Sequence, residues 1–297
     1  IYCGEGGNFM KYMSGDEIRQ AFLDFFSSKD HLIRPSAPLV PENDPTLLWI
    51  NAGMAPFKPY FSGKLTPPST IIATSKKCIR TSDIKNVGKT ARHQTFFEML
   101  GNFSFGDYFK KEAITWAWEF VTEVLELEKE NLWITIYKED EKSFSIWNEI
   151  VGVDEDKIVR MDKDENFWLH GTGPCGPCSE IHYDRGEEYG EVEADNIADI
   201  IEGNGDRFLE IWNLVFTQYD FTEEGEYLQL PNKNIDTGMG LERVASLLQD
   251  VDTNYETDFF KPIIKDLETK TEYNYKESEK ITTAYRVIAD HIRGITI

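Results

Sequence analysis

The chain has 297 residues, of which 40% are hydrophobic and 13% aromatic, so it can build a folded core and is not a disordered chain. No apolar run approaches the ~18 residues that a membrane helix requires, so we expect no membrane association. A formal net charge of −22 at pH 7 argues against a surface that binds long nucleic acids, because phosphates would be repelled. The four cysteines do not make a disulfide framework for a chain of this size, which predicts a reducing, cytoplasmic compartment.

One segment is basic, although the chain as a whole is acidic. Between residues 71 and 111, eight lysines and arginines stand against three acidic residues, which gives a local charge of +5. A basic island of this size within an acidic chain suits a small polyanion better than a long nucleic acid. A chance cluster of surface lysines is the alternative that composition alone leaves open.

Both ends of the sequence indicate a fragment. Residues 1–12 are glycine-rich and are predicted to be a disordered leader. At the other end the chain stops at Ile297 inside an apolar-periodic run, without a capping or breaking residue. We expect one large domain over residues 13–270, followed over residues 271–297 by the start of a truncated helical region.

The first half of the chain mixes helices and strands. Ser14-Gly-Asp-Glu17 is a capping box and predicts a helix over residues 16–29. A proline-rich loop then leads to a strand-like segment at 47–50 and to a strand at 70–74. Helices are also predicted at 111–125 and 141–150, with a strand at 132–137 between them.

The second half is predicted to contain a tight loop at 171–177, a long buried strand at 208–221 and a helix from Leu241 onward. The acidic stretch 186–199 is predicted to be a mobile surface insertion. Because strands mostly follow one another without regular βαβ alternation, we predict an α+β fold with a mainly antiparallel sheet flanked by helices.

The run Asp236-Thr-Gly-Met-Gly-Leu-Glu-Arg243 places two glycines between a predicted strand and a predicted helix. Glycine lets the backbone approach a ligand closely, and the free N–H groups at a helix start favour an anion. Arg243 lies in the first turn and adds a guanidinium suited to phosphate oxygens. Asp236 precedes the junction and could bind a cation such as an ammonium group. A turn of this kind can also be purely structural.

A second group of residues surrounds a polar loop. Cys78-Ile-Arg80 ends one predicted strand, and Arg92-His-Gln-Thr-Phe-Phe97 begins the next. Arg80 suits the charge that develops on a reacting phosphate, since binding that strengthens in the transition state accelerates the step. Phe97, taken alone, is more simply explained as a core aromatic.

Taken together, the two runs resemble motifs 2 and 3 of class II aminoacyl-tRNA synthetases. Further stretches narrow the resemblance to alanyl-tRNA synthetases and extend it from about Met13 to Ile297: Asp44-Pro-Thr-Leu-Leu48, Asn51-Ala-Gly-Met54, residues 95–109, Gly173-Pro-Cys-Gly-Pro-Cys178 and Glu210-Ile-Trp-Asn213. The resemblance implies a class II aminoacylation domain over 13–270 that forms alanyl-adenylate from L-alanine and ATP. It also implies that residues 271–297 begin a region recognising the tRNA(Ala) acceptor stem, mainly through parts missing from this chain. The fragment itself is expected to be monomeric.

The resemblance also implies site residues. Arg80, as the arginine of motif 2, would hold the α-phosphate and the substrate carboxylate, and Arg243 would be the second catalytic arginine. The implied ATP-binding residues are Arg80, Gln94, Phe97, Trp168, Ile211, Trp212, Asn213, Gly240 and Arg243. The implied alanine-binding residues are Trp168, Asn213, Val215, Asp236 and Gly238, with Asp236 taking the amino group. Gln94 departs from the pattern, because many family members have a second histidine there, and the loop after Arg80 is short.

Two metal predictions remain. Glu210, a glutamate within a predicted buried strand, could support Mg²⁺ that bridges ATP phosphates. His170, Cys175, Cys178 and His182 have a spacing that could bind zinc, but the intervening prolines and glycines equally suit a rigid loop lining the site. We therefore expect Mg²⁺ with ATP and no zinc here. An adenylating ligase of the same fold that loads something other than tRNA, and a non-catalytic relative that only binds ligands, are the alternative functions.

Overall fold

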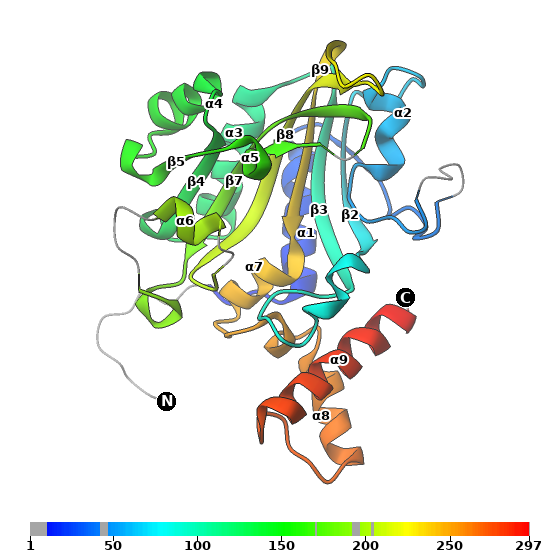
Figure 1. The fold of residues 1–297 in the computed structure, drawn as a ribbon, viewed down its shortest axis with the longest axis vertical. Coiled ribbons are helices and arrows are strands. Elements are labelled where there is room, and N and C mark those ends of the chain that lie inside the picture. Colours follow the sequence, from blue (N-terminus) through cyan, green and yellow to red (C-terminus); the bar gives the residue numbers. More distant parts are fainter. Residues whose placement is uncertain (1–10, 42–46, 170, 192–196, 203–204, 297) are drawn as a thin grey trace.

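The computed structural model describes residues 11–41, 47–169, 171–191, 197–202 and 205–296 (Figure 1). The predicted leader therefore lies almost entirely outside the described residues. None of the described helices has the length and apolar character needed to cross a lipid bilayer.

One long sheet organises the molecule. Its strands lie in the order β1-β2-β3-β9-β8-β7-β4-β5, and β6 pairs with β7. Every pair is antiparallel except β1 with β2 and β4 with β5. The strands span Leu32–Ile33 (β1), Ile71–Ile79 (β2), Phe96–Phe105 (β3), Leu132–Tyr137 (β4), Ile158–Met161 (β5), Phe167–Trp168 (β6), Gly173–Asp184 (β7), Phe208–Phe221 (β8) and Tyr227–Gly240 (β9). The α+β prediction with a mainly antiparallel sheet is confirmed.

The helices flank this sheet. They span Gly15–Ser28 (α1), Lys58–Phe61 (α2), Lys110–Glu119 (α3), Glu141–Ser145 (α4), Lys163–Asn166 (α5), Ile197–Glu202 (α6), Leu241–Leu248 (α7), Lys261–Lys270 (α8) and Glu279–Thr296 (α9). In Figure 1, α1 runs behind the central strands, and α8 and α9 lie below the lower end of the sheet. A small separate core that includes Tyr255, Phe260 and Tyr285 joins α8 to α9.

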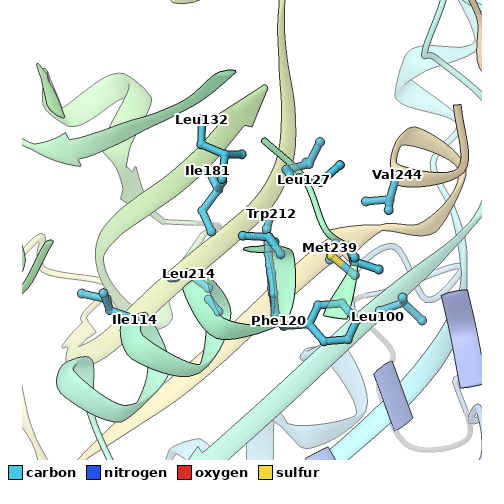
Figure 2. Packing of buried hydrophobic residues seen from close by; sticks show 14 of the residues in the cluster. Leu100, Ile114, Phe120, Leu127, Leu132, Ile181, Trp212, Leu214, Met239 and Val244 are labelled. Carbon is cyan, nitrogen blue, oxygen red and sulfur yellow. The ribbon is translucent and has the colours of Figure 1, made fainter. Parts of the chain in front are cut away.

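The main hydrophobic core covers the sheet face behind the long central strands. Trp212 of β8 is fully buried there, with its ring centroid 5.7 Å from Phe22 and 5.8 Å from Phe120. Figure 2 shows Trp212 and Phe120 among aliphatic side chains from neighbouring strands and helices. Aromatic rings at these separations add edge-to-face attraction to the burial of apolar surface. Because this face is filled, the opposite face is the one left for a ligand.

Several predicted elements are confirmed. The capping box of α1 forms as expected, since the Ser14 hydroxyl accepts from the Glu17 N–H and the Glu17 carboxylate accepts from the Ser14 N–H at 2.8 Å. The strands predicted at 132–137 and 208–221 have those bounds. The helices predicted at 111–125 and 141–150 are present, and each ends in a π-helical stretch, Phe120–Val124 and Ile146–Val151.

The strand predicted at 47–50 is wrong. Residues 48 and 49 form a bend, and Leu48 is 76% exposed, so this apolar run does not lie in the sheet. Ile50 alone is held, by an N–H bond to the Leu39 carbonyl at 2.8 Å and by accepting from the Ile79 N–H at 2.9 Å. An apolar run of four residues was too short a signal to distinguish a strand from a buried anchor in a loop.

The tight loop predicted at 171–177 is also wrong, because β7 begins at Gly173. The pairing of β7 with β8 is irregular between Cys175 and Cys178, and proline is tolerated in a central strand where ladder hydrogen bonds are interrupted in this way. At Gly176 a Cβ atom would lie only 2.0 Å from the Phe216 carbonyl oxygen. Glycine is therefore needed for the two backbones to approach.

The acidic segment predicted as a mobile insertion is partly described. Residues 192–196 lie outside the described part, whereas Tyr189 donates a hydrogen bond to Asp252 at 2.8 Å. Arg207 donates to the Gly190 carbonyl at 2.8 Å. The first half of the segment is thus tied to the body of the protein.

Candidate functional site

A cavity of about 330 Å³ opens on the sheet face opposite the main core. Four adjacent strands, β3, β9, β8 and β7, contribute to its lining. Most of the site residues predicted from the sequence meet there: Arg80, Gln94, Phe97, Trp168, Glu210, Asn213, Val215, Asp236, Gly238, Gly240 and Arg243. Residues that lie up to about 160 positions apart in the chain therefore form one site.

A β-bulge in β8 decides which of its side chains face the cavity. His182 of β7 pairs with Glu210 and Ile181 pairs with Trp212, so Ile211 is an extra residue without a partner on β7. A bulge of this kind re-aims the side chains beside it. As a result Glu210 and Asn213, three positions apart, both line the cavity.

The same bulge directs Ile211 and Trp212 away from the cavity. Their side chains are 1% and 0% exposed and belong to the main core. The sequence predicted that both residues contact ATP. With their side chains in the core, any such contact would have to come from their backbone atoms.

Arg80 and Phe97 form one wall of the cavity. The Arg80 guanidinium donates to the Asn51 carbonyl at 2.9 Å and lies 5.0 Å from the centre of the Phe97 ring. Phe97 is half-buried, whereas its neighbour Phe96 is 1% exposed. Phe96 is thus the core aromatic of the pair, and Phe97 is placed at the cavity, where an aromatic face can stack on a planar group.

Arg243 and Glu210 form a second charged group. The Arg243 guanidinium lies 2.7 Å from the Glu210 carboxylate and also donates to the Glu210 carbonyl at 2.8 Å. Partial burial opposes ionisation of Glu210, but the adjacent Arg243 outweighs it and holds the pKa of Glu210 below its usual value. The carboxylate is therefore charged at neutral pH and fixes the guanidinium at the cavity wall.

Glu210 fits the predicted magnesium role only in part. It supplies a charged carboxylate at the cavity, which is the ligand type that Mg²⁺ prefers. Within the described residues, however, no group of three His, Cys, Asp or Glu side chains is placed to hold a metal ion. A magnesium ion here would need further oxygen ligands from phosphates and water.

Asp236 carries an unusual charge environment. It is 8% exposed, and burial raises the pKa of its carboxyl to about 7. No hydrogen bond to this carboxylate is found within the described part of the chain, so its ionised form lacks compensation there. A ligand cation beside it would supply the missing charge. This property agrees with the predicted ammonium-binding role.

The space beside Asp236 is small. Asp236 pairs with Val215 across the two central strands, and Gly238 pairs with Asn213. At Gly238 a Cβ atom would lie 2.8 Å from the sulfur of Met99. Because Gly238 has no side chain, the Met99 side chain can occupy this space. Met99 thereby closes the cavity next to Gly238.

Glu180 lines the cavity but was missed by the sequence analysis, which assigned the start of its strand to a loop. Its carboxylate accepts from the Asn213 amide nitrogen at 2.9 Å and lies 3.1 Å from the His182 ring nitrogen Nε2. This contact fixes the orientation of the Asn213 amide. The Asn213 carbonyl oxygen is buried and has no partner within the described structure, so it can accept from a ligand. The signal that could have found this residue was a glutamate next to Ile181 in a segment whose side chains are mostly buried, since a glutamate is rarely buried without a partner.

Gln94 offers a donor in the same way. It is 5% exposed, and its carbonyl oxygen accepts from the Asn254 amide at 3.3 Å. Its amide nitrogen Nε2 is buried without a partner within the described chain. Gln94, which lines the cavity, can therefore donate a hydrogen bond to a ligand.

The possible zinc ligands do not assemble. Cys175 and Cys178 are buried thiols, and burial raises the pKa of Cys175 to about 11 and that of Cys178 well above its usual value. Thiols bind zinc as thiolates, so these environments oppose it. His182 is engaged by Glu180, and His170 lies outside the described residues. The described residues of this set do not fit a zinc site.

The basic island is divided, because Lys77, Lys85, Lys89 and Lys111 are exposed whereas its other four cations are buried or lie at the cavity. Lys76 is 1% exposed, and burial lowers its pKa to about 8. Lys110 is buried in an ion pair with Asp140, and Arg92 is 9% exposed at the cavity. Neither a surface cluster nor a continuous nucleic-acid track describes these cations, because several of them lie in the interior or at the site.

Two fixed guanidinium groups and a carboxylate without a partner among the described residues share one cavity on an antiparallel sheet, an arrangement that can hold phosphates beside a cationic group. The chain matches the family model "tRNA synthetases class II (A)" over residues 17–297, and it belongs to this family.

Its curated relatives carry the name alanine–tRNA ligase. The protein from Thermoanaerobacter pseudethanolicus is 57% identical over 287 residues, covering 97% of this chain and 32% of the relative. The proteins from Caldicellulosiruptor saccharolyticus and Pseudothermotoga lettingae are 60% and 61% identical, over 95% and 96% of this chain and 32% and 33% of their own lengths. The chain thus spans about a third of the length of these relatives.

The first prediction concerns the cost of the Asp236 charge. Because burial raises the folded-state pKa to about 7 from 3.8, the ionised carboxylate destabilises the ligand-free protein as pH rises through about 7. Asp236→Asn should therefore stabilise the protein at pH 8, by at least ~1–2 kcal/mol, and change little near pH 2.5, where the carboxyl is protonated in both the folded and the unfolded state. Urea unfolding at several pH values measures this difference. A stability gain that is independent of pH would contradict it.

Proposed function

We propose that this domain activates L-alanine with ATP, forming alanyl-adenylate and pyrophosphate. The observation that carries the proposal is the buried Asp236 carboxylate, which has no partner among the described residues and faces the same cavity as Arg80 and Arg243. An ammonium group would neutralise Asp236, and phosphates would take the two guanidinium groups. The names of the curated relatives support alanine as the amino acid.

The reaction needs positioning more than proton transfer. The alanine carboxylate oxygen attacks the α-phosphorus of ATP, the new O–P bond forms, and the bond to the β-phosphate oxygen breaks, so that pyrophosphate leaves with the electron pair. No general base is required because the nucleophile is already an anion. Arg80 and Arg243 would stabilise the negative charge that spreads over the phosphoryl oxygens. Magnesium bound with ATP would add positive charge, and Glu210 would be its protein ligand.

Selection of alanine rests on the size of the amino-acid end of the cavity. Asp236 and the free carbonyl oxygen of Asn213 would accept hydrogen bonds from the ammonium group. Val215 and Trp168 line the cavity beside them, and Met99 closes the space at Gly238. Side chains much larger than a methyl group would be rejected by contact, whereas glycine and serine would be excluded weakly, because one methyl or hydroxyl group adds only ~1–3 kcal/mol of discrimination.

The adenine and triphosphate would occupy the other end of the cavity. Phe97 would stack on adenine, and the unpaired amide nitrogen of Gln94 would donate to ATP. Transfer of alanine to the 3′ end of tRNA(Ala) is proposed for the longer protein, since this chain spans about a third of its relatives.

Pyrophosphate exchange into ATP, measured with each of the twenty amino acids, tests the proposal directly. We expect exchange that depends on alanine, with weaker exchange for glycine and serine. Folded protein that supports exchange with no amino acid would refute activation, and exchange with a different amino acid would refute the choice of alanine.

The second prediction tests the role of Arg80. Arg80→Ala should lower kcat/KM for exchange by about 10²–10³, since a charged donor to the reacting phosphate is lost. Arg160→Ala is a matched control, because Arg160 lies on the edge strand β5 and pairs with the exposed Glu141. Steady-state exchange assays and thermal unfolding of both variants separate loss of catalysis from loss of fold. Retained activity in Arg80→Ala would rule out the proposed role.

The third prediction tests the size of the alanine pocket. The methyl group of Gly238→Ala would meet the Met99 sulfur, which lies near the end of a flexible side chain and can move. The displaced Met99 should narrow the pocket, so kcat/KM should fall more for alanine than for glycine, by about tenfold. Exchange assays with both amino acids give the ratio. An equal fall for the two would show that Gly238 does not limit the space for the side chain.

A further inference from the structure

The loop between Arg80 and Gln94 is held by residues far away in the sequence. Tyr255, which is fully buried, donates its hydroxyl to the His93 carbonyl at 2.6 Å, and this hydroxyl accepts from the Gly88 N–H at 3.1 Å. The Asn254 N–H donates to the Ala91 carbonyl at 3.0 Å. The second half of the loop, from Gly88 to His93, is therefore anchored at three points.

Helix α9 packs directly on this loop. Gly88 has a φ of +78°, and a Cβ atom there would lie 2.9 Å from the Thr283 carbonyl oxygen of α9. The left-handed conformation and the close approach both require glycine at this position. Arg286 of α9 stacks over the Tyr255 ring, with its guanidinium carbon 5.4 Å from the ring centre.

Asp290 connects α9 to Arg80 through two hydrogen-bonded steps. Its carboxylate is fully buried and accepts from both the N–H group, at 2.9 Å, and the hydroxyl of Thr95. The carbonyl oxygen of Thr95 in turn accepts from the Arg80 N–H at 2.9 Å. Thr95 also lies directly beside Gln94 in the chain. Hydrogen bonds to a buried carboxylate are among the stronger ones in proteins, so this contact fixes the backbone on which both side chains stand.

Arg293, nearly one turn further along α9, makes a second connection. Its guanidinium lies 2.6 Å from the Glu242 carboxylate and 4.8 Å from the centre of the Phe96 ring. Both carboxylate oxygens of Glu242 also accept from the Glu98 N–H, at 3.1 Å, and Glu242 lines the cavity. The buried ion pair between Arg293 and Glu242 thus connects α9 to the start of α7. Through the bonds that Glu242 accepts from the Glu98 N–H, it also connects α9 to β3.

We propose that α9 positions the ATP half of the site, with Asp290 as the positioning residue for Arg80 and Gln94. The proposal rests on the proposed function of the cavity. The amino-acid half is built differently, since Asp236, Asn213 and Val215 stand on β8 and β9, whereas α9 packs on β3 and α8. Displacing α9 should therefore weaken ATP binding more than alanine binding, because Arg80 would contact both substrates whereas the ammonium contacts at Asp236 and Asn213 do not depend on α9.

The fourth prediction follows from this asymmetry. Asp290→Ala should raise KM for ATP in the exchange assay about tenfold, because hydrogen bonds to a charged group are lost, and should raise KM for alanine several-fold less than KM for ATP. Asp290→Asn, which keeps the size of the side chain and one acceptor oxygen, should shift KM for ATP in the same direction by less. Glu279→Gln is the matched control, since Glu279 is an exposed carboxylate at the start of the same helix, and it should change neither constant.

Hydrogen exchange gives a readout that does not depend on activity. In Asp290→Ala the amides of residues 81–95 should exchange faster, whereas those of β8 and β9 should keep their protection. If Asp290→Ala does not fold, the same comparison is made with Asp290→Asn. Equal increases in both KM values, or unchanged loop protection, would overturn the positioning role. Absence of exchange activity in the unmodified chain would instead count against the proposed function, while the loop measurement would still decide the role of Asp290.

Discussion

The extra residue Ile211 in β8 is the local constraint on which the rest of the site depends. Without it, strict alternation would place Ile211 beside Asn213 on the cavity face and would turn Glu210 toward the core. With it, Ile211 and Trp212 both enter the core, and Glu210 and Asn213 both face the ligand side. The bulge therefore joins the packing around Trp212 to the placement of two charged or polar groups, so the core and the site cannot be altered independently there.

The carboxylates around the cavity fall into two groups. Glu210 and Glu242 are matched by arginines, so their negative charge is compensated before any ligand arrives. Asp236 is not matched within the described chain, and burial disfavours its charge. A buried group that lacks a protein partner marks the place where binding energy is available to a ligand of the opposite charge. The protein thus fixes the guanidinium groups of Arg243 and Arg293 with its own carboxylates. The charge of Asp236 would be compensated only when the ammonium group of the amino acid binds.

The sequence predicted what local patterns encode and missed what distant contacts decide. The capping box at Ser14 and the strand at 208–221 depend on neighbouring residues, and both are present as predicted. Most predicted site residues also line one cavity. They could be predicted because the sequence motifs that contain them are long and specific. The inward turn of Trp212 could not be predicted, since a bulge breaks the two-residue period without a sequence signal of its own.

The missed residues have a common physical reason. Asn254, Tyr255 and Asp290 contact the loop between Arg80 and Gln94 from about 160 to 200 positions away. Each resembles an ordinary polar or aromatic residue until the tertiary structure places it. Glu180 was missed because glycines and prolines before it suggested a loop, whereas the irregular pairing with β8 lets that segment run as a strand. The predicted boundary at residue 270 stays a prediction, although α9 shares buried contacts with β3.

The buried charges of the described residues balance one another. Lys76, Arg92, Lys110 and Arg293 are buried, and so are Asp140, Asp236, Glu242 and Asp290, so the exterior carries the net charge of −22 almost undiminished. Like charges at such density repel one another and favour expansion, and dissolved salt screens them over about 10 Å at 0.1 M. Raising the ionic strength should therefore increase the free energy of unfolding of this domain. Dilution into low salt should lower it, although no individual contact has been removed.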